Sequence, residues 1–199
     1  MTLIAFDAVT CVRGGRALFE GLSFTLEQGG AALVTGPNGI GKSSLIRLAA
    51  GLLAPAAGRI TGDVPRALLT DQASLDEELP LARALAFWAR LDRAADNVAA
   101  ALDALALTDL ADIPVRLLST GQRRRAAIAR VIASRAPLWL LDEPANGLDT
   151  AALGLLETAI AAHRASNGAV LMASHTPITL PAAIAIDLSQ HLSQLERAG

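Results

Sequence analysis

Residues 31–53 read AALVTGPNGIGKSSLIRLAAGLL and contain the pattern of a strand, a glycine loop and a helix. The first part, Ala31 to Thr35, is a short apolar run that predicts a buried strand, and the apolar spacing from Ser43 to Leu53 predicts a helix. Between them, Gly36 to Ser43 fits the pattern G-x-x-x-x-G-K-[ST] in the strand-to-helix context that the pattern requires. The sequence therefore predicts a loop that binds the phosphates of a nucleotide.

The residue types of this loop explain its expected chemistry. Glycines let the backbone wrap so that successive N–H groups and the helix N-terminus face phosphate oxygens. Lys42, the one lysine among the 17 Lys and Arg residues, would bridge the β- and γ-phosphates, and Ser43 would ligate Mg²⁺. The predicted nucleotide-binding residues are Gly36, Pro37, Asn38, Gly39, Ile40, Gly41, Lys42, Ser43 and Ser44. The structural alternative is a plain glycine turn.

A second motif, LWLLDEP at residues 138–144, predicts a buried strand with an acidic end. The strand would deliver Asp142 to its carboxyl end, where the carboxylate can hold the Mg²⁺ shell. The neighbouring Glu143 can polarise an attacking water as a general base. Without such a function, two carboxylates at the end of a buried strand would be energetically unfavourable, because burial disfavours charged groups. A strand end that turns into solvent is the alternative.

The composition is that of a single globular domain. The chain has 199 residues, of which 52% are hydrophobic and 18% are charged, and its formal net charge is −2. This charge weakens nucleic-acid binding as a primary role, and the charge-poor composition suggests that a partner covers some surface. One cysteine, Cys11, excludes a disulfide framework. We find no signal-peptide pattern and no membrane-spanning apolar run, which predicts a cytoplasmic location.

Strand and helix patterns alternate along the chain, which predicts an α/β fold with a mainly parallel sheet and right-handed crossovers. Strands are expected at 3–12 and 22–26, as an antiparallel pair, and at 31–35, 67–70, 138–142 and 169–174, with a small hairpin over 58–70. Helical patterns cover 43–53, 74–110, 119–134 and 151–166. The segment at about 73–117 is expected to be a helical insertion into one domain with a core of about 1–72 and 118–199.

The order of the motifs resembles that of the ATP-binding-cassette (ABC) ATPases over essentially the whole chain. Residues 118–122 read LSTGQ, where that family has LSGGQ. Gln72 matches the family's Q-loop, residues 146–149 match its D-loop, and His175 matches its switch histidine. The resemblance implies an α/β P-loop NTPase fold of the ABC nucleotide-binding type, with a small antiparallel β-subdomain and an inserted helical subdomain.

The resemblance also implies the catalytic and metal-binding residues. Glu143, His175 and Gln72 would be catalytic, with ATP as the bound nucleotide. Ser43, Gln72 and Asp142 would hold Mg²⁺.

A further set of residues would act on the nucleotide of a second subunit. The resemblance implies that Ser119, Gly121, Gln122 and Asp149 contact ATP across a head-to-tail homodimer that encloses two ATP molecules. A helix N-terminus with a serine hydroxyl is a suitable site for an anion. Thr120 replaces a glycine of the family and adds a branched side chain beside the phosphate.

The family usually stacks adenine on an aromatic side chain upstream of the phosphate loop. This chain has no tyrosine, and Arg13 occupies the corresponding position. A guanidinium can stack on a base, so Arg13 is a candidate adenine contact. The alternative is a solvated arginine in a turn.

Other polar and aromatic residues are assigned to the surface. Arg123 to Arg125 would form a solvated or partner-facing side of their helix. His163 and His191 lie among polar residues and are expected to be exposed. Phe87 and Trp88 lie beside a helical apolar stripe, and either both belong to the core or one faces a partner.

Within the family, residues 19–26, 113–144 and 173–180 resemble the ATPase subunits of the bacterial cytochrome c maturation system, also described as haem exporter ATP-binding proteins. The resemblance implies an energy-coupling ATP hydrolase in the haem export or delivery step of c-type cytochrome biogenesis. Two copies would join two integral-membrane permease subunits at the cytoplasmic face of the inner membrane, and would serve a haem chaperone only indirectly. No haem-attachment CxxCH motif occurs, so this subunit would supply energy only.

Other functions remain open from the sequence. One is the ATPase subunit of another small bacterial transporter. Another is a soluble cassette ATPase acting on nucleic acid or the ribosome, which only the arginine triplet favours. Such proteins usually carry two cassettes or long coiled coils, and 199 residues do not hold them. The LSTGQ segment with Gln72 and His175 disfavours a P-loop kinase of small molecules.

Overall fold

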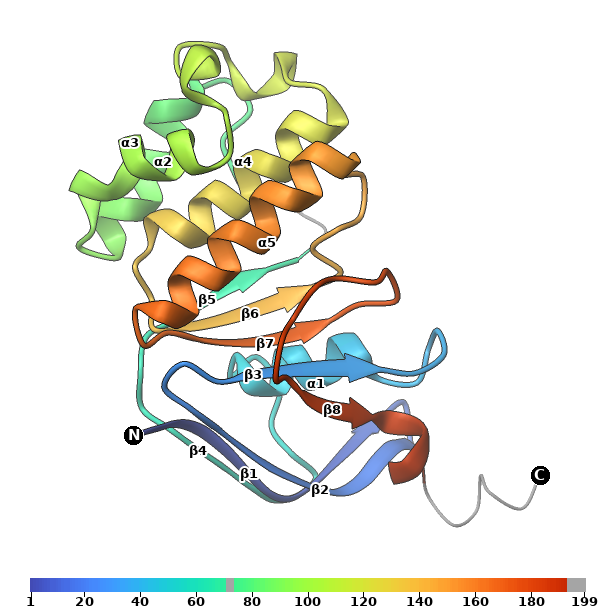
Figure 1. Cartoon of the computed structure of the whole chain (residues 1–199). Coiled ribbons are helices and arrows are strands. Elements are labelled where there is room, and N and C mark those ends of the chain that lie inside the picture. The colour runs from blue at the N-terminus through green and yellow to red at the C-terminus, as the bar shows by residue number, and fades with distance from the viewer. Residues whose placement is uncertain (71–73, 193–199) are drawn as a thin grey trace.

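The computed structural model describes residues 1–70 and 74–192. Its strands are β1 (Thr2–Arg13), β2 (Arg16–Glu27), β3 (Ala31–Thr35), β4 (Ala57–Thr61), β5 (Arg66–Leu69), β6 (Leu138–Asp142), β7 (Ala169–Ala173) and β8 (Ile184–Asp187). Its α-helices are α1 (Lys42–Ala49), α2 (Leu81–Leu91), α3 (Val98–Ala104), α4 (Thr120–Ala133) and α5 (Thr150–Ala165). Figure 1 shows two sheets below a group of helices.

The smaller sheet is antiparallel and has the order β2-β1-β4. The predicted pairing of the first two strands is confirmed, with Phe6 opposite Phe24. The predicted hairpin over residues 58–70 is wrong, because β4 pairs with β1 while β5 joins the other sheet. The two strands differ in burial: β4 is largely exposed, whereas Ala67 and Leu69 of β5 are buried. The buried strand therefore pairs within the larger core.

The larger sheet has the order β5-β6-β7-β3-β8, and all of its pairs are parallel, as expected. No sequence pattern indicated strand β8, because it has only four residues and two of them are exposed. Strand β6 is buried on both faces, with Leu138 and Leu140 in one apolar cluster and Trp139 and Leu141 in the other. A strand with two buried faces reads as a continuous apolar run, which is why this strand was evident.

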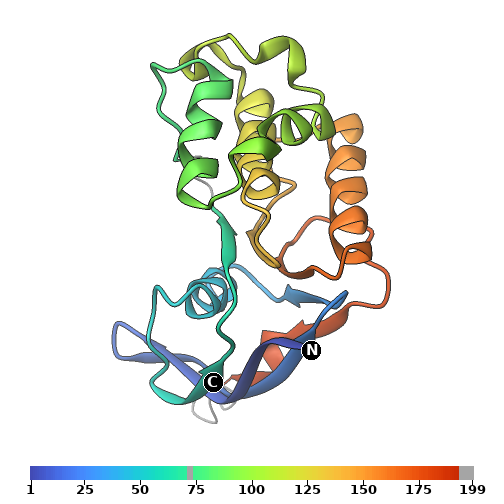
Figure 2. The same cartoon turned by 90° about the vertical axis from the view of Figure 1, so that its left-hand side faces the viewer.

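The two apolar clusters lie on opposite faces of the parallel sheet. One face packs against α1, which lies between this sheet and the antiparallel sheet (Figure 2). The other face is covered by α4 and α5, and α2 and α3 pack on α4 (Figure 1). Helix α4 is thus buried between the sheet and the helices of the 73–117 segment.

Of the two neighbouring aromatic residues in the 73–117 segment, Trp88 is partly buried and Phe87 is exposed. Leu81 and Leu85 of α2 are fully buried. Trp88 is half-buried, and its Nε1–H donates to the carbonyl of Ser74 at 2.8 Å. Phe87 is 55% exposed. Only one of the two aromatic side chains therefore contributes to the core.

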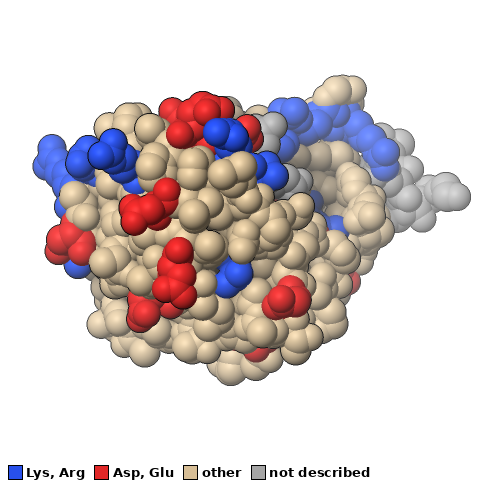
Figure 3. Space-filling view, turned by 90° about the horizontal axis from the view of Figure 1, so that it is seen from above, with Lys and Arg blue, Asp and Glu red and all other residues tan. Residues whose placement is uncertain are grey.

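The face formed by the helices carries charges of both signs. Figure 3 shows acidic and basic side chains interspersed there, with wide uncharged areas between them. Within residues 1–70 and 74–192, no helix combines the length and apolar character needed to cross a bilayer.

Candidate functional site

The carboxyl ends of three neighbouring strands bring the predicted motifs together. Strands β6, β7 and β3 are adjacent and parallel, and the register places Asp142 beside Ala173 and Ala173 beside Val34. Parallel strands end at the same edge of a sheet, where α/β proteins bind their ligands. The phosphate loop after β3, the two acids at the end of β6 and His175 after β7 therefore lie at one edge.

These segments enclose a cleft of about 460 Å³. The residues that line it are Leu18, Asn38, Gly39, Gly41, Lys42, Ser43, Ser44, Glu143, Asn146 and His175. Most of them were predicted as site residues. Leu18 of β2 was missed, because no motif links the antiparallel sheet to the loop. Asn146 was recognised only as part of the D-loop.

Lys42 is folded back onto the phosphate loop. Its Nζ donates to the carbonyls of Gly36 at 2.8 Å and Pro37 at 3.2 Å, and its side chain is buried. The ammonium group is thus held at the centre of the loop, at the N-terminus of α1. A fixed cation beside the N–H groups of a helix start forms an anion site.

Gly41 must be a glycine for two reasons. Its φ of 116° lies in a region that L-residues rarely adopt, and a Cβ there would approach Leu18 Cβ to 3.1 Å. The residue directly precedes α1, so a side chain would disturb both the helix start and its contact with β2.

The acidic residue of the cleft is paired with the histidine. Glu143 Oε2 accepts the backbone N–H of His175 at 3.1 Å and lies 2.8 Å from His175 Nδ1. The Glu143 side chain is 17% exposed, whereas that of His175 is 59% exposed. The carboxylate therefore has a fixed orientation at the base of the cleft, and the imidazole is open to a ligand.

Only part of the predicted metal site can be located. Ser43 lies in the cleft, and Asp142 is buried at the end of β6. Gln72 lies outside the described residues. A hydroxyl, a carboxylate and an amide oxygen are hard donors of the kind that Mg²⁺ prefers together with phosphate oxygens and water. Ser43 and Asp142, the two members of the set that the structure describes, therefore fit magnesium by the type of their donor atoms.

The LSTGQ residues lie outside this cleft. Ser119 and Gln122 form a capping box at the start of α4: Ser119 Oγ accepts the N–H of Gln122 at 3.2 Å, and Gln122 Oε1 accepts the N–H of Ser119 at 2.8 Å. A Cβ on Gly121 would lie 3.3 Å from the carbonyl of Gly147. The start of α4 thus packs on the D-loop of its own chain, and Ser119 and Thr120 are exposed.

Asp149 also caps a helix. Its Oδ1 accepts the N–H of Ala152 at 2.7 Å at the start of α5. This bond explains an aspartate at this position through local structure.

Arg13 is exposed at the β1–β2 turn and lines neither cavity next to the phosphate loop. A second cavity there, of about 290 Å³, is lined by Arg16, Leu18 and residues 37–40, with Leu192. Among the described residues, the arginine beside the loop is therefore Arg16 of β2. The adenine contact of Arg13 stays a prediction.

The expectation of a solvated arginine triplet is wrong for Arg124, which is 8% exposed. Its guanidinium donates to backbone carbonyls at the ends of β5 and β6. Arg123 and Arg125 are partly exposed, and they donate to the carbonyls of Leu118 and Leu105, both at 3.0 Å. The prediction was wrong because it treated all three arginines as solvated charges, whereas a guanidinium can also donate hydrogen bonds to buried carbonyls.

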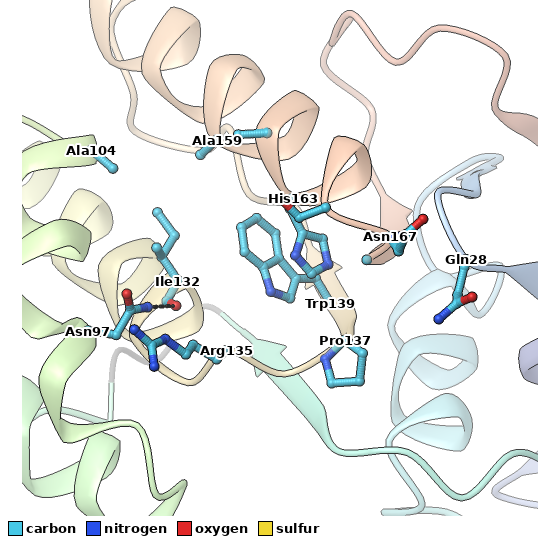
Figure 4. A pocket seen from close by; sticks show the side chains of 13 residues that line it. Gln28, Asn97, Ala104, Ile132, Arg135, Pro137, Trp139, Ala159, His163 and Asn167 are labelled. Carbon is cyan, nitrogen blue, oxygen red and sulfur yellow. Dashed lines mark hydrogen bonds between the residues drawn. The ribbon is translucent and has the colours of Figure 1, made fainter.

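His163 was also predicted to be a surface residue, and this is wrong. Its ring stacks on Trp139, with the centroids 3.9 Å apart, in a cavity of about 530 Å³ between α4 and α5 (Figure 4). Burial lowers the pKa of His163, and its hydrogen bond to the Ala169 carbonyl opposes this shift. A Cβ on Gly168 would lie 2.1 Å from the ring, so glycine makes room for the stack. This cavity shares no lining residue with the cleft at the phosphate loop.

Comparison with curated proteins gives close relatives. A sequence profile of the ABC transporter family matches residues 19–146. A protein of Sphingopyxis alaskensis described as cytochrome c biogenesis ATP-binding export protein CcmA is 61% identical over 180 residues, 90% of this chain and 93% of that protein. A protein of Rhodospirillum rubrum with the same description is 47% identical over 209 residues, 98% of this chain and 90% of that protein.

Solved structures have the same fold. A putative ABC transporter ATP-binding protein from Pyrococcus furiosus has a TM-score of 0.85 at 20% identity, over 96% of this chain and 99% of that chain, a likeness of fold alone. An inward-facing putative metal-chelate type ABC transporter has a TM-score of 0.80 at 27% identity, over 94% of this chain and 80% of that chain. The predicted fold class is confirmed, and the chain belongs to the ATPases of the ABC transporter family and, within them, to the CcmA cytochrome c biogenesis ATP-binding export proteins.

Proposed function

We propose that this chain hydrolyses ATP to drive a CcmAB-like transporter in the haem export or delivery step of c-type cytochrome biogenesis. The observation that carries the proposal is the Glu143–His175 pair, which lies in the same cleft as Lys42 of the phosphate loop. The pair joins a general base to a group that can contact a γ-phosphate. The export step comes from the names of the relatives.

ATP binds with its phosphates in the loop of residues 36–44. Lys42 Nζ exchanges its two carbonyl contacts for phosphate oxygens, and the start of α1 donates N–H groups to the same anion. Mg²⁺, held by Ser43, Asp142 and Gln72, would neutralise charge on the β- and γ-phosphates. Glu143 takes the proton of the attacking water, and His175 orients the carboxylate and contacts the γ-phosphate.

The site is completed by a second copy of the chain. Ser119 and Thr120 are exposed at the start of α4, and the residues that line the cleft do not include them. The capping box uses Ser119 Oγ as an acceptor, which leaves the hydroxyl hydrogen to donate to a phosphate of the other subunit. Gly121, Gln122 and Asp149 hold this helix start and the D-loop in place for a head-to-tail homodimer around two ATP molecules.

Two integral-membrane, CcmB-like permease subunits complete the complex at the cytoplasmic face of the inner membrane. The helical subdomain of about 73–117 provides the contact surface, since Phe87 and Leu91 of α2 are 55% and 62% exposed. Exposed apolar side chains on one helix are typical of a covered surface. The haem chaperone acts on the far side of the permease and does not contact this subunit.

The test is a pull-down of the tagged full-length chain from detergent-solubilised membranes of its own organism. Mass spectrometry is expected to identify a permease encoded beside cytochrome c maturation genes. Phe87→Ser on α2 should weaken this capture, and Leu52→Ser, an exposed apolar residue outside α2, is the matched control. Capture of a permease encoded beside a substrate-binding protein would replace the cytochrome c assignment with another transporter. Salt-dependent capture of nucleic acid would refute the transporter role.

A further inference from the structure

We propose that Arg124 is a positioning residue that holds the catalytic carboxylate of Glu143 in place and links it to the helix that serves the opposite ATP site. The inference rests on the proposed function and names a residue that the ATPase mechanism above does not use. Arg124 is a charged side chain of α4 that is only 8% exposed, and it lies next to the edge of the sheet that carries the proposed active site.

The guanidinium of Arg124 joins the ends of two strands. Its Nη1 donates to the carbonyl of Thr70, the residue after β5, at 2.8 Å. Its Nη2 donates to the carbonyls of Asp142, at 3.1 Å, and Glu143, and its Nε donates to that of Pro144 at 3.2 Å. The Arg124 side chain thus donates hydrogen bonds to the carbonyls of three consecutive residues, 142–144, which include both acidic residues of the site.

The backbone of Glu143 needs such support. Its φ of 47° places it in the left-handed region, which non-glycine residues adopt at a cost in energy. Its N–H donates to the carbonyl of Ala173 at 2.8 Å, so β7 holds the residue on one side. Arg124 holds its carbonyl on the other side, and His175 contacts its carboxylate. A strained conformation persists where several contacts determine it together.

The position of Arg124 on α4 gives this support a second consequence. The same helix starts at Ser119, whose exposed N-terminal turn is proposed to contact the ATP of the opposite subunit. Residue 124 lies in the second turn of this helix, so a shift of α4 on closure of the dimer is passed directly to the carbonyl of Glu143. We infer that Arg124 couples engagement of one ATP to the placement of the base at the other.

Arginine suits this task and lysine does not. A guanidinium is a planar fork with five N–H donors in fixed directions, and it can join carbonyls of two strands at once. An ammonium group is a point charge that would keep the charge but lose the fixed geometry. The alternative is that Arg124 stabilises the fold without affecting the position of the Glu143 carboxylate. The two hypotheses predict different values of kcat for the Arg124 variants.

The test compares Arg124→Lys and Arg124→Gln in the full-length chain with its permease. We measure kcat and KM for ATP hydrolysis, ATP binding with a fluorescent analogue, and the thermal unfolding midpoint. Arg135→Gln is the matched control, since Arg135 pairs with Asp96 on the surface at the far end of α4. Lys42→Ala reports on the proposed function itself.

We expect Arg124→Lys to fold and to bind ATP with a KM within about twofold of wild type, but to lose at least about tenfold in kcat, because a base displaced by a fraction of an ångström is strongly impaired. The loss should be larger in Arg124→Gln. The inference is overturned if kcat of Arg124→Lys stays within twofold, or if it falls only in proportion to the folded fraction. Failure of the proposed function is a different result: wild type would lack ATPase activity, or Lys42→Ala would retain it.

Discussion

Glu143 Oε2 lies 2.8 Å from Nδ1 of His175, although 32 residues separate them in the chain. The same oxygen accepts the backbone N–H of His175. One residue follows β6 and the other follows β7, and the pairing of these strands brings them together. The contact fixes the carboxylate in the cleft that Lys42 of the phosphate loop also lines, as the proposed role of Glu143 as a general base requires.

Glu143→Gln tests this role. The amide keeps the shape of the side chain and an oxygen for the N–H of His175, but it cannot accept the proton of water. We expect hydrolysis to fall at least about 100-fold while ATP still binds, so that an ATP-bound dimer accumulates. Size-exclusion chromatography with ATP measures the dimer. Glu157→Gln, which alters an acceptor for the N–H of Thr179, is the control. A monomeric, fully active Glu143→Gln protein would refute both the base and the dimer.

Lys42→Ala tests the phosphate loop. Loss of the ammonium group removes charge-assisted contacts with phosphate oxygens, so ATP affinity should fall by at least about tenfold, and turnover with it. Isothermal titration with ATP gives the affinity. Arg47→Ala removes an exposed positive charge from the same helix and should leave binding unchanged. Normal hydrolysis by Lys42→Ala would remove this residue from the site.

Ser119 caps helix α4 and is proposed to contact the ATP of the opposite subunit, and two variants distinguish these roles. Ser119→Ala removes the N-cap of α4 and should lower the free energy of unfolding by about 1 kcal/mol. Ser119→Asp keeps a good N-cap but presents a negative charge to the phosphate of the opposite subunit. We expect it to retain stability and to lose ATP-dependent dimerisation. If Ser119→Asp dimerises and hydrolyses ATP as wild type does, the start of α4 does not contact ATP.

His163 should make the stability of the fold depend on pH. Burial lowers its pKa below the usual 6.5, so the unfolded chain takes up the proton more readily than the folded one. The contribution of the neutral ring is fully present above 6.5 and is lost as the pH falls from there toward the folded-state pKa. Urea unfolding midpoints between about pH 7.5 and about pH 5.5 measure this loss. His163→Phe keeps a ring on Trp139 without a proton and should show a smaller fall. An equal fall in both proteins would exclude His163 as the cause.

Local patterns explain why much of the site was predictable. The phosphate loop needs consecutive residues with defined backbone freedom, and Gly36 to Ser43 carry that requirement in one stretch. The capping box of Ser119 and Gln122 is also local, because the two residues are three apart, but this helix start was interpreted from the sequence only as an anion site. The strand before Glu143 was evident because both of its faces are buried.

Non-local contacts explain the errors. Arg124 is in a run of three arginines, and only the fold determines which of them hydrogen-bonds to the carbonyls of Asp142 and Glu143. His163 is surrounded by polar residues in sequence, but Trp139 reaches it from another element. The segment at 58–70 has the composition of a hairpin, yet its two strands find better partners in separate sheets.

The amino-acid sequence was enough to predict a phosphate loop with its single lysine, an acidic strand end and a helix start suited to an anion. These three features depend on the types of residues that lie close together in the sequence. The arrangement of these features relative to one another follows only from the folded chain. The fold placed Glu143 against His175 and set Arg124 behind the same glutamate. Strand pairing and burial are satisfied by residues far apart in the chain, so no local pattern shows which residues will come into contact.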